Sequence, residues 1–579
     1  MDKWCIYRVD LGAGNVRLEQ VPDRWQRLGG RALTSAVVAE LVPPRCNPLG
    51  EGNVLALATG LLAGSGASSS TRLSLGAKSP LTGGIKESNV GGQAGYALAG
   101  LGVRCLIIEG SMPDGWCVVR LSPDGLVLED AQDLMGLDVY RTVAKLRHRC
   151  GPGAAVLAVG PAGEMGLSAA NVGVSDVDGI PARHAGRGGL GAVMGGKRIK
   201  AIIIDPSDSR PPQPTNRKDL SAAVKRFAQA LLSHPVTGES LPTFGTSVLI
   251  NAINARGGLP TRNFQAGSFG NAEQISGEAL HDLILRRGGK PTHRCMPGCV
   301  IRCSNVLLDE WGEELTRGLE YESIALLGSN CGIGDLDTIA RLNLRCDELG
   351  LDTIEIGVAL GVAMEAGVAD FGDAEAIAAL LEEIGVGTPL GRALGHGAAV
   401  VGRVFGRSRV PVVRGQAMAA YDPRALKGTG VTYATSPMGA DHTAGNALPG
   451  STLPDGTEPD PCKAEGQVML SRYLQHLATV FDLLGLCWFT RGPILGDHSL
   501  VTDLLEAQHG GDWSFGELFD LAQQTLNTEL AFNRDAGVTA VDDLPCFFRT
   551  EPLPPGNYTF DVPAEALAST LAGSKSQVS

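Results

Sequence analysis

The chain has 579 residues and 44% of them are hydrophobic, so its composition is that of a globular protein and excludes a disordered one. A formal net charge of −13 argues against a nucleic-acid partner. No run approaches the roughly eighteen apolar residues of a membrane span, and the N-terminus has no apolar signal core, so we expect a cytoplasmic protein.

The first 200 residues or so alternate β-type runs with glycine and proline. The N-terminal stretch 1–16 predicts a strand, a Gly-rich turn and a second strand. Further strands are expected within 53–60, 71–78, 104–110, 116–130, 154–160 and 200–208. Prolines and charges then gather in 205–220, which is typical of a linker. The sequence therefore predicts an N-terminal β-rich domain over residues 1–208.

The pattern becomes helical after the linker, with helices expected within 218–234, 339–367 and 466–489. A second boundary falls near 405–420. We expect two mostly α-helical domains, over residues 209–412 and 413–579, and hence an α+β multidomain fold.

The stretch HRCMPGCVIRC contains Cys295, Cys299 and Cys303 with three residues between neighbours. Pro297 and Gly298 favour a loop, which can point three thiols inward at one centre. Such spacing suits an iron–sulfur cluster or zinc, but zinc sites usually add a second cysteine pair and none follows. The alternatives are three unrelated buried cysteines and the radical-enzyme pattern C-x3-C-x2-C, whose last gap is one residue shorter.

Two glycine-rich stretches imitate nucleotide-binding patterns. GRGGLG (186–191) is not preceded by an expected strand, and GAVMGGK (191–197) continues with Arg198 where a P-loop needs Ser or Thr. Neither nucleotide interpretation holds. What remains is a run of glycines whose backbone N–H groups can hold a phosphate or pyrophosphate.

Two octapeptides, CDELGLDT (346–353) and FDLLGLCW (481–488), share the pattern D-x-x-G-L at the end of a helical run. Glycine there can take positive φ and let the chain turn back. Either copy alone is a common helix end, but the second is followed directly by Cys487.

Two acids flank Tyr321 where the sequence turns apolar, Glu320 and Glu322. A carboxylate entering apolar surroundings can act as an acid or base, although such acids alone favour a solvated surface. His442 lies in a loop of small residues that permits close approach of a ligand, although a lone loop histidine is usually structural.

Taken together, six segments resemble the tungsten-containing aldehyde:ferredoxin oxidoreductase family in order and spacing: 29–60, 74–110, 184–202, 319–332, 421–445 and 482–487. The resemblance implies a β-sandwich-like base domain that carries a tungsten (or molybdenum) bis-pterin cofactor beneath two helical domains. It also implies oxidation of aldehydes to carboxylic acids, with electrons leaving through one [4Fe–4S] cluster to ferredoxin or a partner iron–sulfur subunit.

The resemblance assigns the residues as follows. The cluster ligands are Cys295, Cys299, Cys303 and Cys487, although the commoner family spacing C-x2-C-x3-C would begin at Met296. The pterin contacts are Asp347, Leu351 and Asp352 in the first D-x-x-G-L stretch, and Asp482 and Leu486 in the second. Arg72 lies between a pterin and the cluster, Gly91 donates to phosphate, and the backbone carbonyls of Asn89 and Ala185 bind Mg²⁺ between the pterin phosphates. Glu322 and His442 lie nearest the tungsten, with Glu322 as general base, and Tyr321 and Tyr421 line the substrate pocket.

Two alternatives stay open at this point. Within the same family, the chain resembles the catalytic subunit of a tungsten-dependent benzoyl-CoA reductase, which reduces an aromatic thioester. From another class, a radical S-adenosylmethionine enzyme would leave one iron without a cysteine, which Cys487 argues against. Some family members dimerise through an iron bound by Glu-x-x-His, and neither residue type is in place in 339–352. The oligomeric state is therefore left open.

Overall fold

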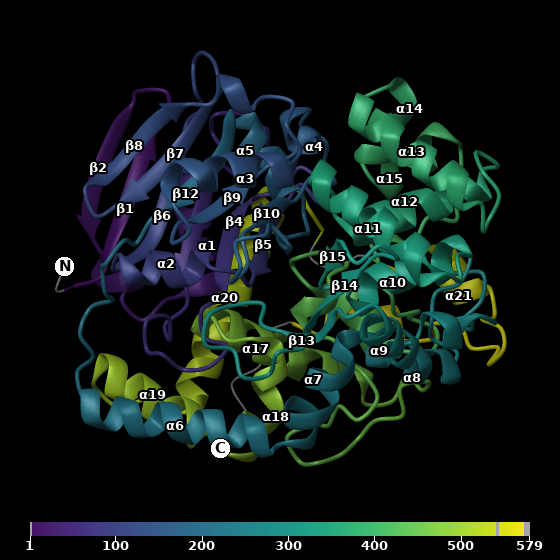
Figure 1. Cartoon of the computed structure of the whole chain (residues 1–579). Helices are drawn as coiled ribbons and strands as arrows, with labels where there is room; N and C mark the ends of the chain where they lie inside the picture. Colours follow the sequence, from purple (N-terminus) through teal and green to yellow (C-terminus); the bar gives the residue numbers. More distant parts are fainter. Residues whose placement is uncertain (1–2, 540–542, 572–579) are drawn as a thin grey trace.

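The computed structural model describes residues 3–539 and 543–571. The first 200 residues form two six-stranded sheets, in the strand orders β2-β1-β6-β3-β4-β5 and β11-β10-β9-β12-β7-β8 (Figure 1). The first sheet comprises β1 Cys5–Asp10, β2 Asn15–Gln20, β3 Leu55–Thr59, β4 Leu73–Lys78, β5 Ile85–Val90 and β6 Val103–Glu109. The second comprises β7 Cys117–Ser122, β8 Gly125–Asp130, β9 Ala155–Ala158, β10 Val172–Val174, β11 Arg183–Ala185 and β12 Ile199–Ile204.

The two sheets are copies of one topology. Each begins with an antiparallel hairpin, β1–β2 or β7–β8, whose first strand pairs in parallel with the last strand of the copy, β6 or β12. The remaining strands, β3–β4–β5 or β9–β10–β11, continue antiparallel from there. A helix follows each hairpin and a shorter one precedes each last strand: α1 Gly30–Leu41 and α2 Ala94–Gly100, then α3 Val139–Cys150 and α5 Leu190–Gly196. The edge strands β5 and β11 lie against each other, so the copies meet there.

The sheets pack face to face and confirm the sandwich-like arrangement. Leu57 and Leu75 of one sheet share a core with Leu157 and Ile202 of the other. α1 covers the outer face of the first sheet and α3 the outer face of the second, each over its own apolar cluster. Inner strands such as β12, sequence IKAIII, are buried throughout because both faces are covered, which explains why they are mostly apolar.

The rest of the described chain is mostly helical, and with the β-rich start it confirms the predicted fold class. The helices not yet given are α4 Pro161–Glu164, α6 Arg217–Ser233, α7 Leu241–Phe244, α8 Leu249–Ala255, α9 Gly277–Arg286, α10 Tyr321–Leu327, α11 Leu336–Leu349, α12 Thr353–Glu365, α13 Ala374–Val386, α14 Pro389–Gly395, α15 Ala398–Val404, α16 Lys427–Thr435, α17 Gln467–Leu484, α18 Arg491–Gly496, α19 Ser499–His509, α20 Phe515–Asp535, α21 Cys546–Thr550 and α22 Ala564–Ala568. The strands are β13 Lys290–His293, β14 Ser304–Leu308, β15 Glu314–Arg317, β16 Val412–Val413 and β17 Gln416–Ala417. Within the described ranges, no helix is long and apolar enough to cross a membrane.

The two helical cores are not contiguous in sequence. α6, directly after the linker, packs with α17, α19 and α20 at the far end of the chain, and the hydrophobic residues of 544–567 join the core of α8 to α16. Each of the two helical cores is thus built from two separate stretches of the chain. The boundaries at 208/209 and 412/413 stay predictions.

One sequence expectation about the glycine-rich stretch is wrong. The strand β11, Arg183–Ala185, ends directly before GRGGLG. It has only three residues, with one apolar residue at its end, so its sequence gave no strand signal. It pairs antiparallel with β10 at a sheet edge, whereas a dinucleotide-binding unit needs a parallel βαβ arrangement, so that interpretation still fails.

Candidate functional site

The two D-x-x-G-L stretches end α11 and α17 in the same way. Gly350 and Gly485 take left-handed backbone conformations, with φ of 75° and 72°, which glycine adopts without strain. Each packs onto a glycine just after a strand of the base domain: Gly350 onto Gly160, after β9 of the second sheet, and Gly485 onto Gly60, after the equivalent strand β3 of the first. A methyl group at Gly160, after β9, would lie 2.4 Å from the Leu349 carbonyl oxygen, and one at Gly60, after β3, 2.2 Å from the Gly485 nitrogen. The duplicated base therefore presents two equivalent seats for the two stretches.

Backbone hydrogen bonds fix both stretches to these seats. The Asn171 nitrogen donates to the Gly350 carbonyl at 2.8 Å, and the Arg72 nitrogen donates to the Gly485 carbonyl at 3.1 Å. Leu351 and Leu486 are buried behind the turns, and Leu351 forms a β-bridge with Ala170. Main-chain hydrogen bonds thus hold both turns, and in the first the Asn171 side chain adds a bond from Nδ2 to the Leu351 carbonyl at 2.7 Å.

A third copy of the pattern, DLMGLD (133–138), escaped the sequence analysis. It lies at the surface before α3, where Asp133 pairs with Lys145 at 2.6 Å and with Arg149. The pattern alone is therefore not specific, and its two other copies are distinguished by their seats on the base domain.

The carboxylates of the first stretch are buried among donors. Asp352 caps α12 by accepting from the Ile354 nitrogen at 2.9 Å, and its other oxygen lies 3.4 Å from Nε of Arg187. Burial raises the pKa of Asp352. Asp347 accepts from Asn343 Nδ2 at 2.9 Å and lies 3.1 Å from His184 Nε2. Their free lone pairs suit the N–H donors of a pterin ring.

Asp482 of the second stretch occupies a similar electrostatic setting. Its carboxylate lies 3.6 Å from Nη1 of Arg31, which is itself held by Glu529 through hydrogen bonds of 2.9 and 2.8 Å. Burial and the nearby Glu87 raise the pKa of Asp482 well above its usual range. A carboxylate that is costly to ionise without more donors fits a site completed by a bound group.

The three clustered cysteines lie in the loop between β13 and β14, as predicted, and Cys487 reaches the same place. The Cys487 nitrogen donates to the Ser69 carbonyl at 2.9 Å, and the Ser69 hydroxyl donates to Cys299 Sγ at 3.4 Å. A hydrogen bond from Cys295 lowers the pKa of Cys299 to about 6. Burial and the charges of Glu320, Cys487 and Cys299 raise the pKa of Cys303. Four mutually interacting thiols form a donor set that fits a [4Fe–4S] cluster.

Arg72 stands between the second stretch and this cysteine loop. Its Nη2 donates to the Asn89 carbonyl at 3.0 Å, and its Nε donates to the Asn89 side chain. A methyl group at Gly91 would lie 3.6 Å from Cys295 Sγ and 3.8 Å from Arg72 Nη1. Ala185, buried at the end of β11, comes from the strand equivalent to that of Asn89, on the seam where β5 meets β11.

The acid and the histidine singled out by the sequence come together. Glu322 Oε1, in the first turn of α10, lies 3.4 Å from Nε2 of His442, and its Oε2 accepts from the Ala420 nitrogen at 2.8 Å. The centre of the Tyr421 ring lies 5.2 Å from the centre of the Tyr321 ring and 6.0 Å from the centre of the His442 imidazole. Within the described chain, Glu322 Oε1 and His442 Nδ1 are buried without a hydrogen-bond partner. Their nearest charged neighbours are each other's residue and Asp441: Glu322 Oε1 faces His442 Nε2, and His442 Nδ1 lies 3.8 Å from Asp441 Oδ1.

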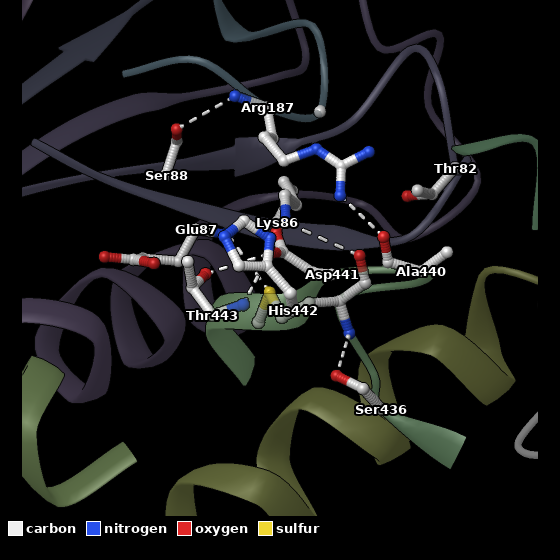
Figure 2. A network of polar contacts seen from close by, with 12 residues as sticks. Thr82, Lys86, Glu87, Ser88, Arg187, Ser436, Ala440, Asp441, His442 and Thr443 are labelled. Carbon is white, nitrogen blue, oxygen red and sulfur yellow. Dashed lines mark hydrogen bonds and ion pairs between the residues drawn. The ribbon is translucent and has the colours of Figure 1, made fainter. Parts of the chain in front are cut away.

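A buried ion pair supports the histidine loop, and the sequence analysis missed it. Lys86 on β5, wholly buried, pairs with Asp441 beside His442 (Figure 2). Burial opposes the ionisation of Asp441, yet the charges of Lys86, Arg187 and His442 hold the pKa of this carboxyl well below its usual range. Arg187 donates to the Ala440 carbonyl at 2.6 Å and so ties this loop to the glycine-rich run.

Other buried polar atoms near these elements also lack partners within the described residues, among them Glu87 Oε1, Asn171 Oδ1 and the Tyr433 hydroxyl. Such groups are usually satisfied in folded proteins. Together with the carboxylates of the two seats and the four thiols, they fit a large polar cofactor that supplies both donors and acceptors.

Comparisons with known proteins agree with this geometry. Two family models match, described as aldehyde ferredoxin oxidoreductase, N-terminal domain, over residues 6–206, and domains 2 and 3 over 222–571. The tungsten-containing aldehyde ferredoxin oxidoreductase of Pyrococcus furiosus is 33% identical over 572 residues, which covers 95% of this chain and 92% of that protein. The enzyme of the same name from Thermococcus kodakarensis is 33% identical over 570 residues, with the same coverage.

A solved structure shares the fold. The active-site complex of benzoyl coenzyme A reductase with 1,5-dienoyl-CoA has a chain that superposes with a TM-score of 0.80, covering 98% of this chain and 92% of that one. The sequence identity is 18%, so this likeness concerns the fold alone.

Proposed function

The chain belongs to the aldehyde ferredoxin oxidoreductase family, and from that premise we propose that it oxidises aldehydes to carboxylic acids at a tungsten (or molybdenum) bis-pterin centre. Members of the family are enzymes, and the two curated relatives described above carry tungsten in their names. The reaction itself is our inference from the site.

The chain's own residues would hold the cofactor on the two seats. Asp347, Leu351 and Asp352 would hold one pterin, and Asp482 and Leu486 the other, because the two stretches occupy equivalent places on a duplicated base. Carboxylates accept strongly from ring N–H and amino donors. At the seam between β5 and β11, the carbonyls of Asn89 and Ala185 would bind Mg²⁺ and Gly91 would donate to phosphate.

Cys295, Cys299, Cys303 and Cys487 would ligate one [4Fe–4S] cluster, with Arg72 between it and the second pterin. When bound, the metal bis-pterin supplies the two-electron oxidation and the cluster supplies a one-electron exit to ferredoxin or a partner iron–sulfur subunit.

Glu322 and His442 would perform the proton chemistry. Oxidising an aldehyde with water yields the acid, two protons and two electrons, so a base must accept a proton from the attacking oxygen. Glu322 Oε1 is free for this, while the Ala420 nitrogen holds its other oxygen in place. The imidazole of His442, which lies 3.4 Å from the acid, would hydrogen-bond the substrate oxygen. Tyr321, fixed by its hydroxyl on the Ala420 carbonyl at 2.6 Å, and Tyr421 would wall the pocket against water.

The observation that carries this proposal is the acid–histidine pair: Glu322 Oε1 lies 3.4 Å from His442 Nε2 and has no hydrogen-bond partner within the described chain. The test is aldehyde-dependent viologen reduction by anaerobically purified protein whose tungsten, molybdenum and iron contents are measured. Glu322→Gln should lower turnover about 10²–10⁴-fold at unchanged metal content. Glu375→Gln, an exposed matched change in the first turn of α13, should leave turnover unchanged.

Failure to oxidise any aldehyde by a fully loaded protein would refute the proposal. Benzoyl-CoA and a cyclic dienoyl-CoA are tested in parallel, because turnover of those thioesters would identify the ring-reducing branch of the fold instead. A requirement for S-adenosylmethionine would indicate the radical-enzyme class.

A further inference from the structure

A second cavity, of about 630 Å³, lies away from the acid–histidine pair. It is bounded by the start of β1, the end of β2, the linker and the loop between α19 and α20. Its lining includes Trp4, Arg27, Arg104, Gln508 and Trp513. This volume is within the range of small-molecule sites.

Arg104 gives the cavity a buried cation. The residue is only 2% exposed, and within the described chain no carboxylate pairs with it. Its Nη1 donates to the Gly60 carbonyl at 3.0 Å, and its guanidinium lies 4.1 Å above the Trp4 ring. Burial lowers the pKa of Arg104 to about 9, so the group stays charged at neutral pH. A buried charge without a counter-ion is costly, which an anionic ligand would relieve.

The rim adds to the positive character. Arg27 lies 4.0 Å above the Trp513 ring, and Lys3 also lines the cavity. Glu517, which does not line the cavity, lies 3.6 Å from Arg27 and offsets part of its charge. Asp512 is the only carboxylate among the lining residues. In a chain of net charge −13, a cavity with three basic side chains is a local exception.

Gln508 provides an independent sign of a ligand. The residue is 5% exposed, lines the cavity, and its Oε1 has no hydrogen-bond partner in the described structure. Its backbone carbonyl is used, because it accepts from the Thr215 nitrogen at 3.2 Å. A buried amide oxygen of this kind requires a donor, and the cavity is the space from which one can come.

We propose that this cavity binds a small organic oxyanion, a carboxylate or a phosphate ester that also carries a hydroxyl or N–H donor. The guanidinium of Arg104 would bind the oxyanion in a fork, Arg27 would add charge at the rim, and Gln508 Oε1 would accept from the donor. The apolar part of the ligand would lie against the free portions of the two tryptophans.

The cavity adjoins the second D-x-x-G-L seat. Arg104 holds the Gly60 carbonyl, and His509 Nε2 lies 2.7 Å from the Leu61 carbonyl. The Leu61 nitrogen in turn donates to the Leu483 carbonyl at 3.1 Å. Two residues that line the cavity, Arg104 and His509, thus hold the segment that seats the end of α17.

The test is isothermal titration of the full-length, cofactor-loaded protein with inorganic phosphate, AMP and benzoate. We expect Arg104→Lys, which keeps the charge and loses the fork, to weaken binding at least tenfold. Arg27→Gln should weaken it by a smaller factor. Arg24→Gln is the matched control, because Arg24, three residues before Arg27, also lies over a tryptophan, 4.7 Å above the Trp25 ring, but does not line the cavity.

Binding of phosphate and AMP that depends on both arginines would support the phosphate form of the ligand. Arginine-dependent binding of benzoate alone would support the carboxylate form. Binding that is unaffected by both changes would overturn the proposal, since it would place the anion elsewhere, as would the absence of binding by all three probes. If Arg104→Lys does not fold, which thermal melting would reveal, Arg27→Gln and the Arg24→Gln control decide.

Discussion

Lys86→Met tests the support of the histidine loop most directly. Lys86 is wholly buried, its ammonium pairs with Asp441, and its stem packs under Gly188, where a methyl group would lie 2.4 Å from Lys86 Cγ. Methionine preserves this volume and removes only the charge. Removing one partner of a buried pair costs about 3–5 kcal/mol, because the other charge is left buried. We expect the lower figure, since Asp441 keeps hydrogen bonds from the Thr443 nitrogen at 3.1 Å and the Thr443 hydroxyl at 2.8 Å.

The loss should depend on pH with a defined sign. In the native protein the pKa of Asp441 is depressed, so its contribution to stability is present above the unfolded pKa, about 3.9, and is lost as pH falls below it. Burial is the largest influence on this pKa and Lys86 is the largest charge that opposes it, so we expect the pKa of Asp441 to rise above its unfolded value in the variant. The variant would then gain stability by binding a proton as pH falls. The difference in melting temperature between wild type and variant should therefore be largest near pH 8 and shrink toward pH 5.

Thermal unfolding at both pH values measures this difference. A loss of about 3 kcal/mol corresponds to about 6–12 °C for a cooperative unit of about 200 residues. Asp441→Asn in the Lys86→Met background should recover much of it, because no unpaired charge remains. Lys145→Met, which breaks an exposed pair with Asp133, should cost at most about 1 kcal/mol. A loss that does not vary with pH, or no recovery in the double variant, would refute the reasoning.

Three further predictions concern single residues. Cys487→Ser should lose iron while the control Cys331→Ser, a buried thiol in a different core, keeps it, as elemental analysis would show. Burial raises the pKa of Glu355 to about 7, so its contribution to stability is complete below the unfolded pKa near 4.5 and is lost as pH rises through 7. Glu355→Gln should accordingly flatten the melting temperature between pH 5 and 7. Gly60→Ala places a methyl group 2.2 Å from the Gly485 nitrogen, so we expect a misassembled second seat with reduced cofactor content by metal analysis.

Periodicity and loop chemistry predicted much of this architecture from sequence. The apolar runs of β3, β6 and β12 identified strands because these strands are covered on both faces. Pro297 and Gly298 correctly predicted that the cysteines lie in a loop, since neither residue favours a helix interior. Each of these signals can be read from a short stretch of sequence without knowledge of its distant contacts.

What escaped the sequence depends on contacts between distant segments. The duplication of the base domain is a likeness of topology, and its clearest residue-level trace is a glycine after β3 and another near the end of β9. Lys86, Arg187 and Asp441 lie within segments that carry the family resemblance, yet in sequence a charged residue among glycines resembles a surface residue until its partner is located. The surface copy of D-x-x-G-L at 133–138 could not be distinguished for the same reason. The pattern is visible in the sequence, but the contact with the base domain that marks the other two copies is not.

The residue that follows each seated turn makes the duplicated base asymmetric. Asp352 and Cys487 occupy equivalent positions with nearly the same backbone, φ and ψ of −69° and 111° against −68° and 135°, and each precedes a helical turn. Asp352 uses its side chain to cap α12, whereas the Cys487 thiol makes no cap and its backbone nitrogen binds Ser69, whose hydroxyl donates to Cys299 Sγ. One substitution at equivalent positions thus separates a helix cap from a proposed cluster ligand. If the proposed function holds, the two seats would hold the pterins alike while electrons would leave from the second seat alone, and we expect the acceptor to dock on the side of the cysteine loop.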